Sequence, residues 1–271
     1  MKRKYKTAIS EGLKIALGIL MIFPVIIMVI AAFQPKEEIL AIPFHLSIHN
    51  PTLDNFKYTF RYMELLTYLK NTFIVIGICL PAQLITSLLA AYAFSFFDFP
   101  LKKTLFTILL MSMMIPGEVV IMTLYKMIIS WNMINTYAGL TITHLVSVGA
   151  VFLFRQNMLS LPPSLWEAAK MDGCGYMRYF VKILVPLCKT LIVARVMESF
   201  IAMYGSHLWP LMVTTKNSMR VVQVGIASIV GAEHYGIVLA AACVVLVIPI
   251  LIFVFGMERI TEGLTSGAVK N

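Results

Sequence analysis

Six long apolar runs dominate this chain of 271 residues, and they decide the solvent in which it can fold. A helix needs about 20 apolar residues to cross the ~30 Å of hydrocarbon in a bilayer, and each run approaches or exceeds that length. A strand would leave backbone groups unpaired in lipid, so the runs predict membrane-spanning helices. The predicted spans are residues 13–33, 69–96, 104–125, 137–158, 188–213 and 237–257.

The composition supports the same class of protein. Hydrophobic residues make up 59% of the chain and charged residues only 13%, with a mean hydropathy of +0.86. A soluble domain carries about 25% charged residues. The basic start, Met1–Lys6, imitates a signal peptide, but the apolar run after it is too long and has no clean cleavage site. We expect an uncleaved first span in a single all-α transmembrane domain over residues 1–271.

The net charge of +9 would also suit a nucleic-acid-binding protein. The placement of the charges favours a membrane topology instead. With the N-terminus in the cytoplasm, fourteen of the 22 Lys and Arg residues fall in cytoplasmic segments, seven in outer segments, and Arg195 within a span. Cytoplasmic loops of membrane proteins carry this excess. The pattern predicts a multi-pass protein of a bacterial inner or plasma membrane, with both termini cytoplasmic and no nucleic-acid partner.

This topology places a polar segment, residues 159–187, in the cytoplasm. Two loops lie outside, at 34–68 and 214–236. Prolines at positions 35, 43 and 51 punctuate the first outer loop, which predicts an extended segment with short turns.

Residues 159–187 have the pattern of two short helices with a glycine turn between them. Ser160 or Ser164 is a candidate N-cap, and Pro162 and Pro163 suit a first turn. Gly173 is a candidate left-handed terminator of the first helix. The second helix is expected over 176–184, before Pro186. A rigid polar element of this kind between two spans suggests a docking site for a cytoplasmic partner.

Several catalytic and metal-binding classes lack their usual patterns in this sequence. The cysteines, at positions 79, 174, 188 and 243, do not have metal-ligand spacing, and we interpret them as free thiols. The sequence has no phosphate-binding loop of the form GxxxxGK[ST] and no catalytic triad. We expect no catalytic residue, no metal and no cofactor bound by this chain.

The segment resembles the hallmark of permease subunits of binding-protein-dependent ABC importers, which is EAA, three residues, Gly, nine residues, then I-x-L-P. The chain has Glu167-Ala168-Ala169, Gly173, Ile183 and Pro186 at that spacing, with Val185 in place of leucine. Further similar stretches cover about residues 10 to 270, and they point to the carbohydrate-uptake class, near the second permease of maltose-type systems. These stretches are Met114–Glu118, Asn135–Leu140, Phe152–Gln156, Leu208–Leu211 and Glu262–Lys270.

The resemblance implies a type I importer permease with six transmembrane helices and a cytoplasmic coupling helix. It implies that Glu167, Ala168, Ala169, Asp172, Gly173, Ile183 and Pro186 form the ATPase-coupling element. The implied partners are a second homologous permease, two ATPase subunits that bind ATP and Mg, an extracytoplasmic binding protein and the bilayer. The tail from Ser266 to Lys270 is expected to reach the ATPases as well.

Polar groups inside spans are candidates for the substrate path, because lipid makes them costly. We take Glu118, Tyr204, Ser206, His207 and Trp209 as these candidates. Relatives often read W-N-E-F-L-W-P where this chain has Tyr204 to Pro210, so substrate assignments do not transfer directly. Arg195 and Glu198 are three residues apart and able to pair, either as a structural contact or in the path. Gln83, Thr86, Ser87 and His144 are interpreted mainly as contacts between helices.

The predicted function is import of a sugar or oligosaccharide by the assembled transporter. Glycerol 3-phosphate or another polyol is the alternative within the same class. An anion needs cations in the path, and Arg195 is expected too near the cytoplasmic end, which favours a sugar. A stand-alone secondary transporter or membrane enzyme is the alternative from another class, although such transporters usually show internal repeats and several acids at mid-membrane depth.

Overall fold

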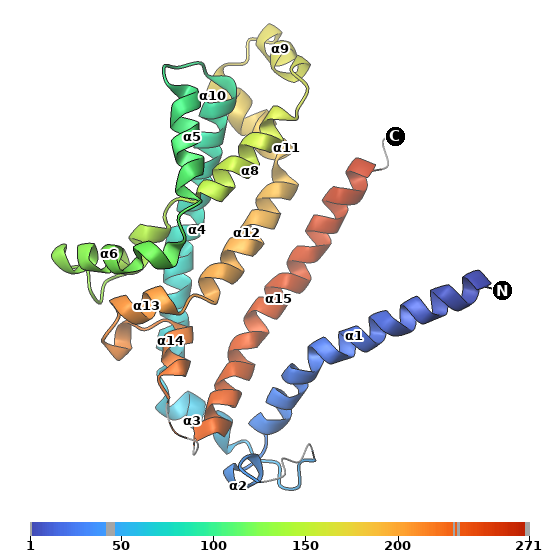
Figure 1. Ribbon diagram of the computed structural model, residues 1–271, viewed down its shortest axis with the longest axis vertical. Helices are drawn as coiled ribbons and strands as arrows, with labels where there is room; N and C mark the ends of the chain where they lie inside the picture. The colour runs from blue at the N-terminus through green and yellow to red at the C-terminus, as the bar shows by residue number, and fades with distance from the viewer. Residues whose placement is uncertain (1, 42–46, 230, 232–233, 269–271) are drawn as a thin grey trace. The chain divides into compact units, whose positions relative to one another are not determined.

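The computed structural model is helical throughout, without a strand in the part of the chain that it describes (Figure 1). It describes the backbone of residues 2–41, 47–229, 231 and 234–268, and within these ranges the side chains from residue 10 to residue 256. The α-helices are α1 (Lys2–Ala32), α2 (Lys36–Ile39), α3 (Asp54–Tyr62), α4 (Leu65–Phe96), α5 (Lys102–Ser112), α6 (Gly117–Ser130), α7 (Tyr137–Thr141), α8 (Val148–Leu159), α9 (Ser164–Met171), α10 (Tyr176–Tyr179), α11 (Val185–Leu187), α12 (Lys189–Tyr204), α13 (Leu208–Val213), α14 (Val222–Ala227) and α15 (Tyr235–Ala268). Single turns of other helix types are η1 (Ile142–His144), η2 (Phe180–Leu184) and η3 (Asn217–Met219).

Contacts within the chain define two compact units. The first unit comprises Met1–Leu66 and Gly225–Ile248, and the second comprises Thr67–Val224 and Pro249–Asn271. Helix α15 runs through both units, with Pro249 inside it where the second unit resumes.

Three of the six predicted spans are single helices long and apolar enough to cross a membrane: Ser10–Ala32, Leu65–Phe96 and Tyr235–Gly256. The third predicted span, 104–125, is instead a bent pair, since α5 and α6 meet at 95° across Met113–Pro116. The break ends at Pro116, and Gly117 is the first residue of α6. The fourth span is also bent, by 40° between η1 and α8, so five spans result if each pair counts as one.

The fifth predicted span, 188–213, is not continuous. Helix α12 ends at Tyr204 after 16 residues, and α13 begins at Leu208. Gly205 lies at the break, where its N–H donates to Ile201 O at 2.9 Å, and Pro210 cannot donate within α13. Glycine and proline within six residues therefore interrupt a run that hydropathy alone predicts as one helix.

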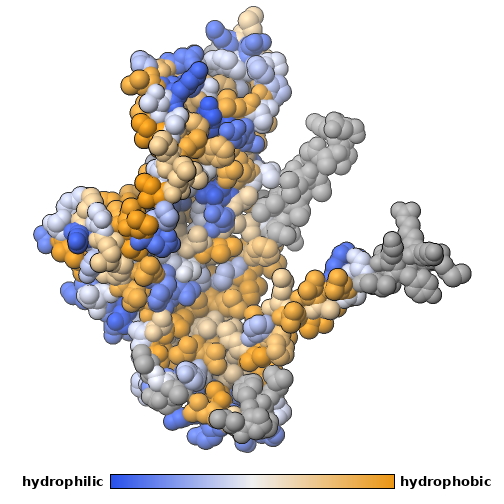
Figure 2. All heavy atoms as spheres, viewed as in Figure 1, coloured by the Kyte–Doolittle hydropathy of each residue, from blue (hydrophilic) through white to orange (hydrophobic). Residues whose placement is uncertain are grey.

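Apolar side chains cover long stretches of the surface, as Figure 2 shows for the visible face. Only 11% of the most apolar window of Ser10–Ala32 is buried within the protein. Leu20 is 66% exposed and Met21 79% exposed. Soluble proteins rarely leave such contiguous apolar patches uncovered, so lipid is the solvent that suits this surface.

The prediction of an extended outer loop over 34–68 is wrong for its described residues. The loop contains α2 and α3. Asn55 of α3 donates from Nδ2 to Ala32 O at 3.0 Å and to Gln34 O at 2.9 Å. Because the last carbonyls of a helix have no partner within it, this amide closes the end of α1. Proline spacing suggested an extended chain, but Pro43 lies outside the described residues, and Asp54 suits the N-terminal dipole of α3.

The bend between η1 and α8 in the second unit frees backbone carbonyls, and α4 supplies their partners. Gln83 donates to His144 O at 2.6 Å, Thr86 to Leu145 O at 3.4 Å, and Ser87 to Ser147 O at 3.3 Å. A broken helix persists at membrane depth only where protein satisfies such groups. The interpretation of these three residues as contacts between helices is confirmed.

Residues Asn135–Gly139 form the turn and the N-terminal cap that begin α7. Asn135 adopts a left-handed φ of 57° and accepts hydrogen bonds from Thr215 N at 2.7 Å and Lys216 N at 2.9 Å. Thr136 caps α7 by accepting from Gly139 N at 3.1 Å. A Cβ at Gly139 would collide with the backbone of Met133. The stretch therefore fixes the entry of α7.

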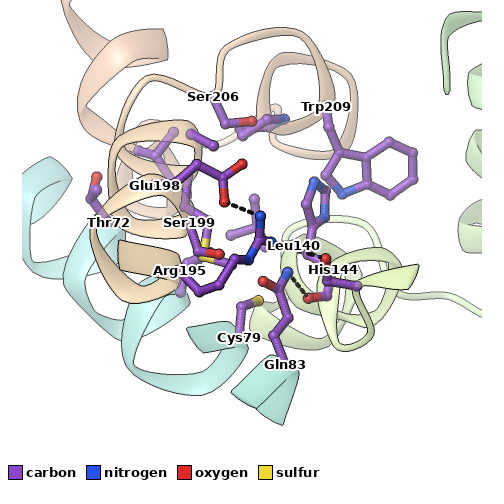
Figure 3. A pocket seen from close by; sticks show the side chains of 16 residues that line it. Thr72, Cys79, Gln83, Leu140, His144, Arg195, Glu198, Ser199, Ser206 and Trp209 are labelled. Carbon is purple, nitrogen blue, oxygen red and sulfur yellow. Dashed lines mark hydrogen bonds and ion pairs between the residues drawn. The ribbon is translucent and has the colours of Figure 1, made fainter. Parts of the chain in front are cut away.

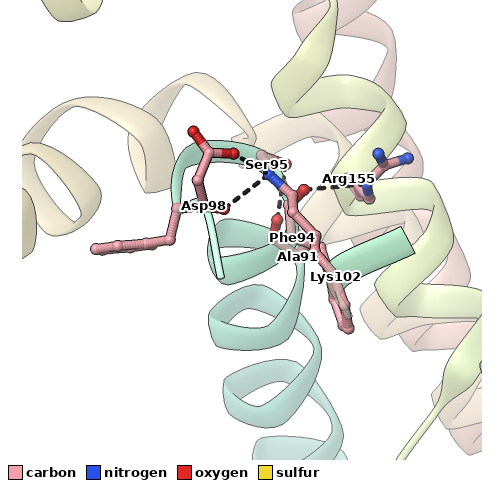
Figure 4. Close-up of polar contacts among 7 residues, drawn as sticks. Ala91, Phe94, Ser95, Asp98, Lys102 and Arg155 are labelled. Atoms are coloured by element: carbon pink, nitrogen blue, oxygen red, sulfur yellow. Dashed lines mark hydrogen bonds and ion pairs between the residues drawn. The ribbon is translucent and has the colours of Figure 1, made fainter. Parts of the chain in front are cut away.

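Two cations close the C-terminal end of α4 (Figure 4). Arg155 donates from Nε to Phe94 O at 3.3 Å, and its guanidinium lies 4.1 Å from the ring centre of Phe106. Lys102 donates to Phe97 O at 2.7 Å and pairs with Asp98 at 3.4 Å. Positive charge at a helix C-terminus is favourable, and these contacts tie α5 and α8 to the end of α4.

Candidate functional site

The first candidate site is the end of the second unit that carries α9, which lies beyond α10 in Figure 1. Helix α9 ends in a Schellman motif. Cys174 N donates to Ala169 O at 2.9 Å and Gly173 N to Lys170 O at 3.0 Å. Gly173 has a φ of 70°, which confirms the predicted left-handed terminator.

The start of α9 differs from the prediction. Neither Ser160 nor Ser164 caps the helix: Ser160 donates its hydroxyl to Asn157 O at 2.8 Å, and Ser164 is already the first helical residue. The first amides instead bond to proline carbonyls, from Leu165 N to Pro162 O at 3.1 Å and from Trp166 N to Pro163 O at 3.0 Å. Backbone oxygens therefore replace the expected hydroxyl.

A cluster of aromatic rings fixes α9 to the end of α4. The Trp166 indole stacks on Tyr176 with ring centres 4.8 Å apart and meets the edge of Tyr179 at the same distance. Tyr92 of α4 donates its hydroxyl to Tyr176 O at 2.9 Å and packs 4.9 Å from Phe180. Burial raises the pKa of Tyr179, so its phenol stays neutral in the cell's pH range. We name Trp166, Tyr92, Tyr176, Tyr179 and Phe180 the aromatic cluster.

The second predicted helix, 176–184, is present with one change. It continues as the wide turn η2 and passes through α11 into α12. Pro186 has no N–H to donate to Lys182, and its ring would crowd that carbonyl, which explains the wider turn. Cys188 donates to Asn157 Oδ1 at 3.2 Å and so connects the start of α12 with α8.

The predicted coupling residues do not share one environment. Glu167, Ala168, Asp172 and Gly173 are exposed, and so is Pro186. Ala169 is only 5% exposed and belongs to the core with Leu184 and Tyr179, and Ile183 packs against that core. Met171 was not predicted as a site residue, yet it is 88% exposed at the tip. Its apolar character next to a helix end was the only signal for it in the sequence.

The second candidate site is a cavity of about 240 Å³ among α4, α7, α12 and α13 (Figure 3). Its polar lining includes Gln83, His144, Arg195, Glu198 and Ser206, and Trp209 forms part of its wall. The Trp209 indole is held in place, because Nε1 donates to Gly139 O at 3.1 Å. The cavity therefore combines a fixed aromatic wall with several hydrogen-bonding groups.

Arg195 and Glu198 form the ion pair that their spacing predicted. Arg195 also donates from Nη2 to Ser147 Oγ at 3.2 Å. The expectation that Arg195 lies too near the cytoplasmic end to meet the path residues is wrong. It lines the same cavity as Ser206 and Trp209. After the break at Tyr204, α13 packs against α6 and α7, which a straight span over 188–213 does not anticipate.

The predicted path residues divide between this cavity and a neighbouring one of about 390 Å³. Ser206 and Trp209 line both cavities, whereas Glu118 and His207 line only the second. Tyr204 lines neither. Its ring is 4% exposed and stacks on Phe200 at 5.4 Å. The end of the predicted tail, Val269 and Lys270, lies outside the described residues.

A helical protein with several apolar helices of membrane-spanning length, an exposed end at α9 and a cavity with polar groups defines a class, and comparisons with known proteins identify the family. Residues 83–262 match the family described as binding-protein-dependent transport system inner membrane component. The chain belongs to this family.

Two curated relatives match along almost the whole chain. The arabinooligosaccharides transport system permease protein of Halalkalibacterium halodurans is 31% identical, with 100% of both chains covered. The sn-glycerol-3-phosphate transport system permease protein of Rhizobium meliloti is also 31% identical, with 97% of each covered. The fold matches a chain of a bacterial ABC transporter involved in the import of the acidic polysaccharide alginate, with a TM-score of 0.82, 15% identity, and 96% and 97% of the two chains covered.

Proposed function

We propose that this chain is the membrane-spanning permease subunit of an ATP-driven importer for a sugar, and that α9 couples it to separate ATPase subunits. The observation that carries the proposal is the division of α9 into two faces. One face, with Ala169 and Trp166, is packed into the protein, while Glu167, Ala168 and Met171 are exposed at the tip.

An exposed helix face transmits force only if the helix is fixed to the parts that must move. The aromatic cluster fixes α9 to α4, and the route through η2 and α11 leads directly into α12. Both α4 and α12 line the cavity. A displacement of α9 by an ATPase would therefore reach two walls of the cavity through packed side chains and continuous helix. This arrangement supports the proposed coupling role of Glu167, Ala168, Asp172 and Gly173.

The family match supports an assembly of several subunits. The proposed assembly contains this chain, a second permease, two ATPases and an extracytoplasmic binding protein. In the proposed orientation both termini and α9 face the cytoplasm, and α3 and α14 face the binding protein. The relatives' names support a sugar or a phosphorylated polyol as substrate.

The test is reconstitution of the assembled transporter with the partner permease and ATPases from the same organism. We would measure ATP hydrolysis stimulated by loaded binding protein, together with ATP-dependent uptake into proteoliposomes. Glu167→Lys reverses an exposed charge at the docking face, and we expect it to abolish most of the stimulation, either by weakening assembly or by uncoupling it. If the Glu167→Lys transporter keeps its stimulated ATP hydrolysis and its uptake, α9 is not the coupling element.

Asp98→Lys is the matched control, because Asp98 is also exposed, on the turn between α4 and α5. It reverses the same kind of charge outside α9, and we expect stimulation to be retained. An equal loss in both variants would indicate a general effect of charge. Uptake by the single chain without ATP would instead support a secondary transporter.

A further inference from the structure

The charge balance of the cavity separates the two substrate classes that the proposed function leaves open, and this inference rests on that function. Of the 16 residues that line the cavity, only Arg195 and Glu198 carry a formal charge when His144 is neutral. They pair with each other. The lining is therefore rich in polar groups but has no net charge.

The pair leaves the carboxylate accessible and only part of the guanidinium reachable. Arg195 uses Nη1 for Glu198 and Nη2 for Ser147, while its buried Nε has no hydrogen-bond partner. The Arg195 side chain is 15% exposed, and the Glu198 side chain is 60% exposed. The fork of the guanidinium thus lies sheltered beside an accessible carboxylate, as Figure 3 shows. Each sugar hydroxyl both donates and accepts, so neighbouring hydroxyls match a donor beside an acceptor.

We propose that this cavity selects a neutral sugar, and that Glu198 excludes anionic substrates by occupying the guanidinium of Arg195. A phosphate or carboxylate would bind a free guanidinium through two parallel hydrogen bonds. Here it must either displace Glu198 or lie beside a like charge, and repulsion between like charges is strong where water is partly excluded. A neutral sugar ring does not have to displace Glu198 and is not repelled by its charge.

The wall of the cavity suits the same ligand. The Trp209 side chain is 6% exposed and is fixed through its bond to Gly139 O. The small exposed part of the indole adds an apolar contact for the C–H groups of a sugar, and the indole N–H is already satisfied. Ser206, at the turn before α13, adds a hydroxyl without a hydrogen bond in the described part of the chain.

The experiment measures equilibrium binding of labelled ligands to the assembled transporter in lipid nanodiscs, without ATP. Neutral probes are arabinotriose, xylotriose and maltotriose. Anionic probes are sn-glycerol 3-phosphate and a galacturonic acid trisaccharide. We expect the intact transporter to prefer the neutral probes by roughly tenfold, since repulsion by one partly shielded charge has about that effect.

Glu198→Gln removes the charge but keeps the shape, and it leaves Arg195 as an unbalanced cation. We expect this variant to shift the preference toward the anionic probes by roughly tenfold. The double variant Arg195→Gln/Glu198→Gln restores neutrality and should restore the original preference. Asp98→Asn removes an equal charge from the exposed turn between α4 and α5, outside both cavities, and should leave the preference unaltered.

Three results would overturn the proposal: an intact transporter that prefers anions, a Glu198→Gln transporter with unchanged preference, or an equal shift in Asp98→Asn. Failure of every probe to bind a transporter that still hydrolyses ATP with its loaded binding protein would also overturn it, while leaving the proposed function intact. Absence of ATP-linked uptake in the intact transporter would instead reject the proposed function itself.

Discussion

The end that carries α9 and the cavity beside α12 are held together by different forces. At the first region, stacked and edge-on rings pack within 4.8–4.9 Å of one another around a core with Tyr179 and Leu184. At the second, Arg195 is held by an ion pair and a hydroxyl, and its buried Nε–H has no hydrogen-bond partner. Close packing makes a region stiff, whereas a polar cavity with spare donors can exchange partners. The contrast suits a region that transmits motion and another that receives a ligand.

The largest effect is expected at the stiff region. Trp166→Ala removes the ring that joins Tyr176 and Tyr179, and loss of a packed Trp costs about 3 kcal/mol. We expect α9 to loosen, ATP hydrolysis to lose its dependence on binding protein, and binding of sugar to persist. Thermal unfolding and stimulated ATPase activity of the assembled transporter check this.

Trp131→Ala is the control for that variant, because Trp131 is 49% exposed at the end of α6. It should leave stimulation intact. Equal loss of coupling in both variants would show that the aromatic cluster has no special role in transmission.

A smaller effect is expected from the turn that ends α9. Gly173→Ala forces a Cβ into the left-handed region at a φ of 70°, which costs about 1–2 kcal/mol. Gly175→Ala lies two residues away with a φ of −74° and open space for a Cβ, so it should be nearly neutral. Thermal stability and stimulated ATPase activity of the two variants measure the difference. Similar values for both would show that the Schellman motif does not hold α9 in place.

The smallest effect on stability is expected at the cavity. Ser147→Ala removes the acceptor for Arg195 and the cap of α8, where Ser147 accepts from Ala150 N at 3.3 Å, at a cost of about 1 kcal/mol. We expect modest destabilisation but a clear change in affinity for neutral sugars, since Arg195 becomes less fixed. Ser112→Ala, an exposed serine of α5, should change neither quantity. Unchanged sugar affinity in Ser147→Ala would show that Arg195 needs no second support.

The sequence predicted features that depend on nearby residues. Glycine at position 173 indicated the left-handed turn, and the three-residue spacing of Arg195 and Glu198 indicated their pair. These depend on backbone chemistry or helical spacing, which a single segment already contains.

Features that join distant segments were not predictable in the same way. Tyr92 donates a hydrogen bond to Tyr176, which lies 84 residues later in the sequence. Arg195 donates one to Ser147, which lies 48 residues earlier. Hydropathy also failed at the break in 188–213, because a run can be apolar throughout and still change direction. Serine near α9 suggested a side-chain cap, but the carbonyls of the adjacent prolines accept those hydrogen bonds instead. The burial of Ala169 depends on neighbours from other segments, which the sequence does not show.

The 95° bend between α5 and α6 determines how far residues 102–130 reach. At 1.5 Å per residue, α5 advances about 16 Å, roughly half of the hydrocarbon thickness. Measured along the axis of α5, helix α6 adds almost no further advance, and its own length of about 21 Å extends sideways. The donors of Met113, Met114 and Ile115 bond three residues back, and Pro116 has none, so the change of direction leaves no N–H of these four residues bare. The third apolar run is thus a lateral arm, and straightening it at Pro116 would carry Trp131 about 21 Å further along the axis of α5.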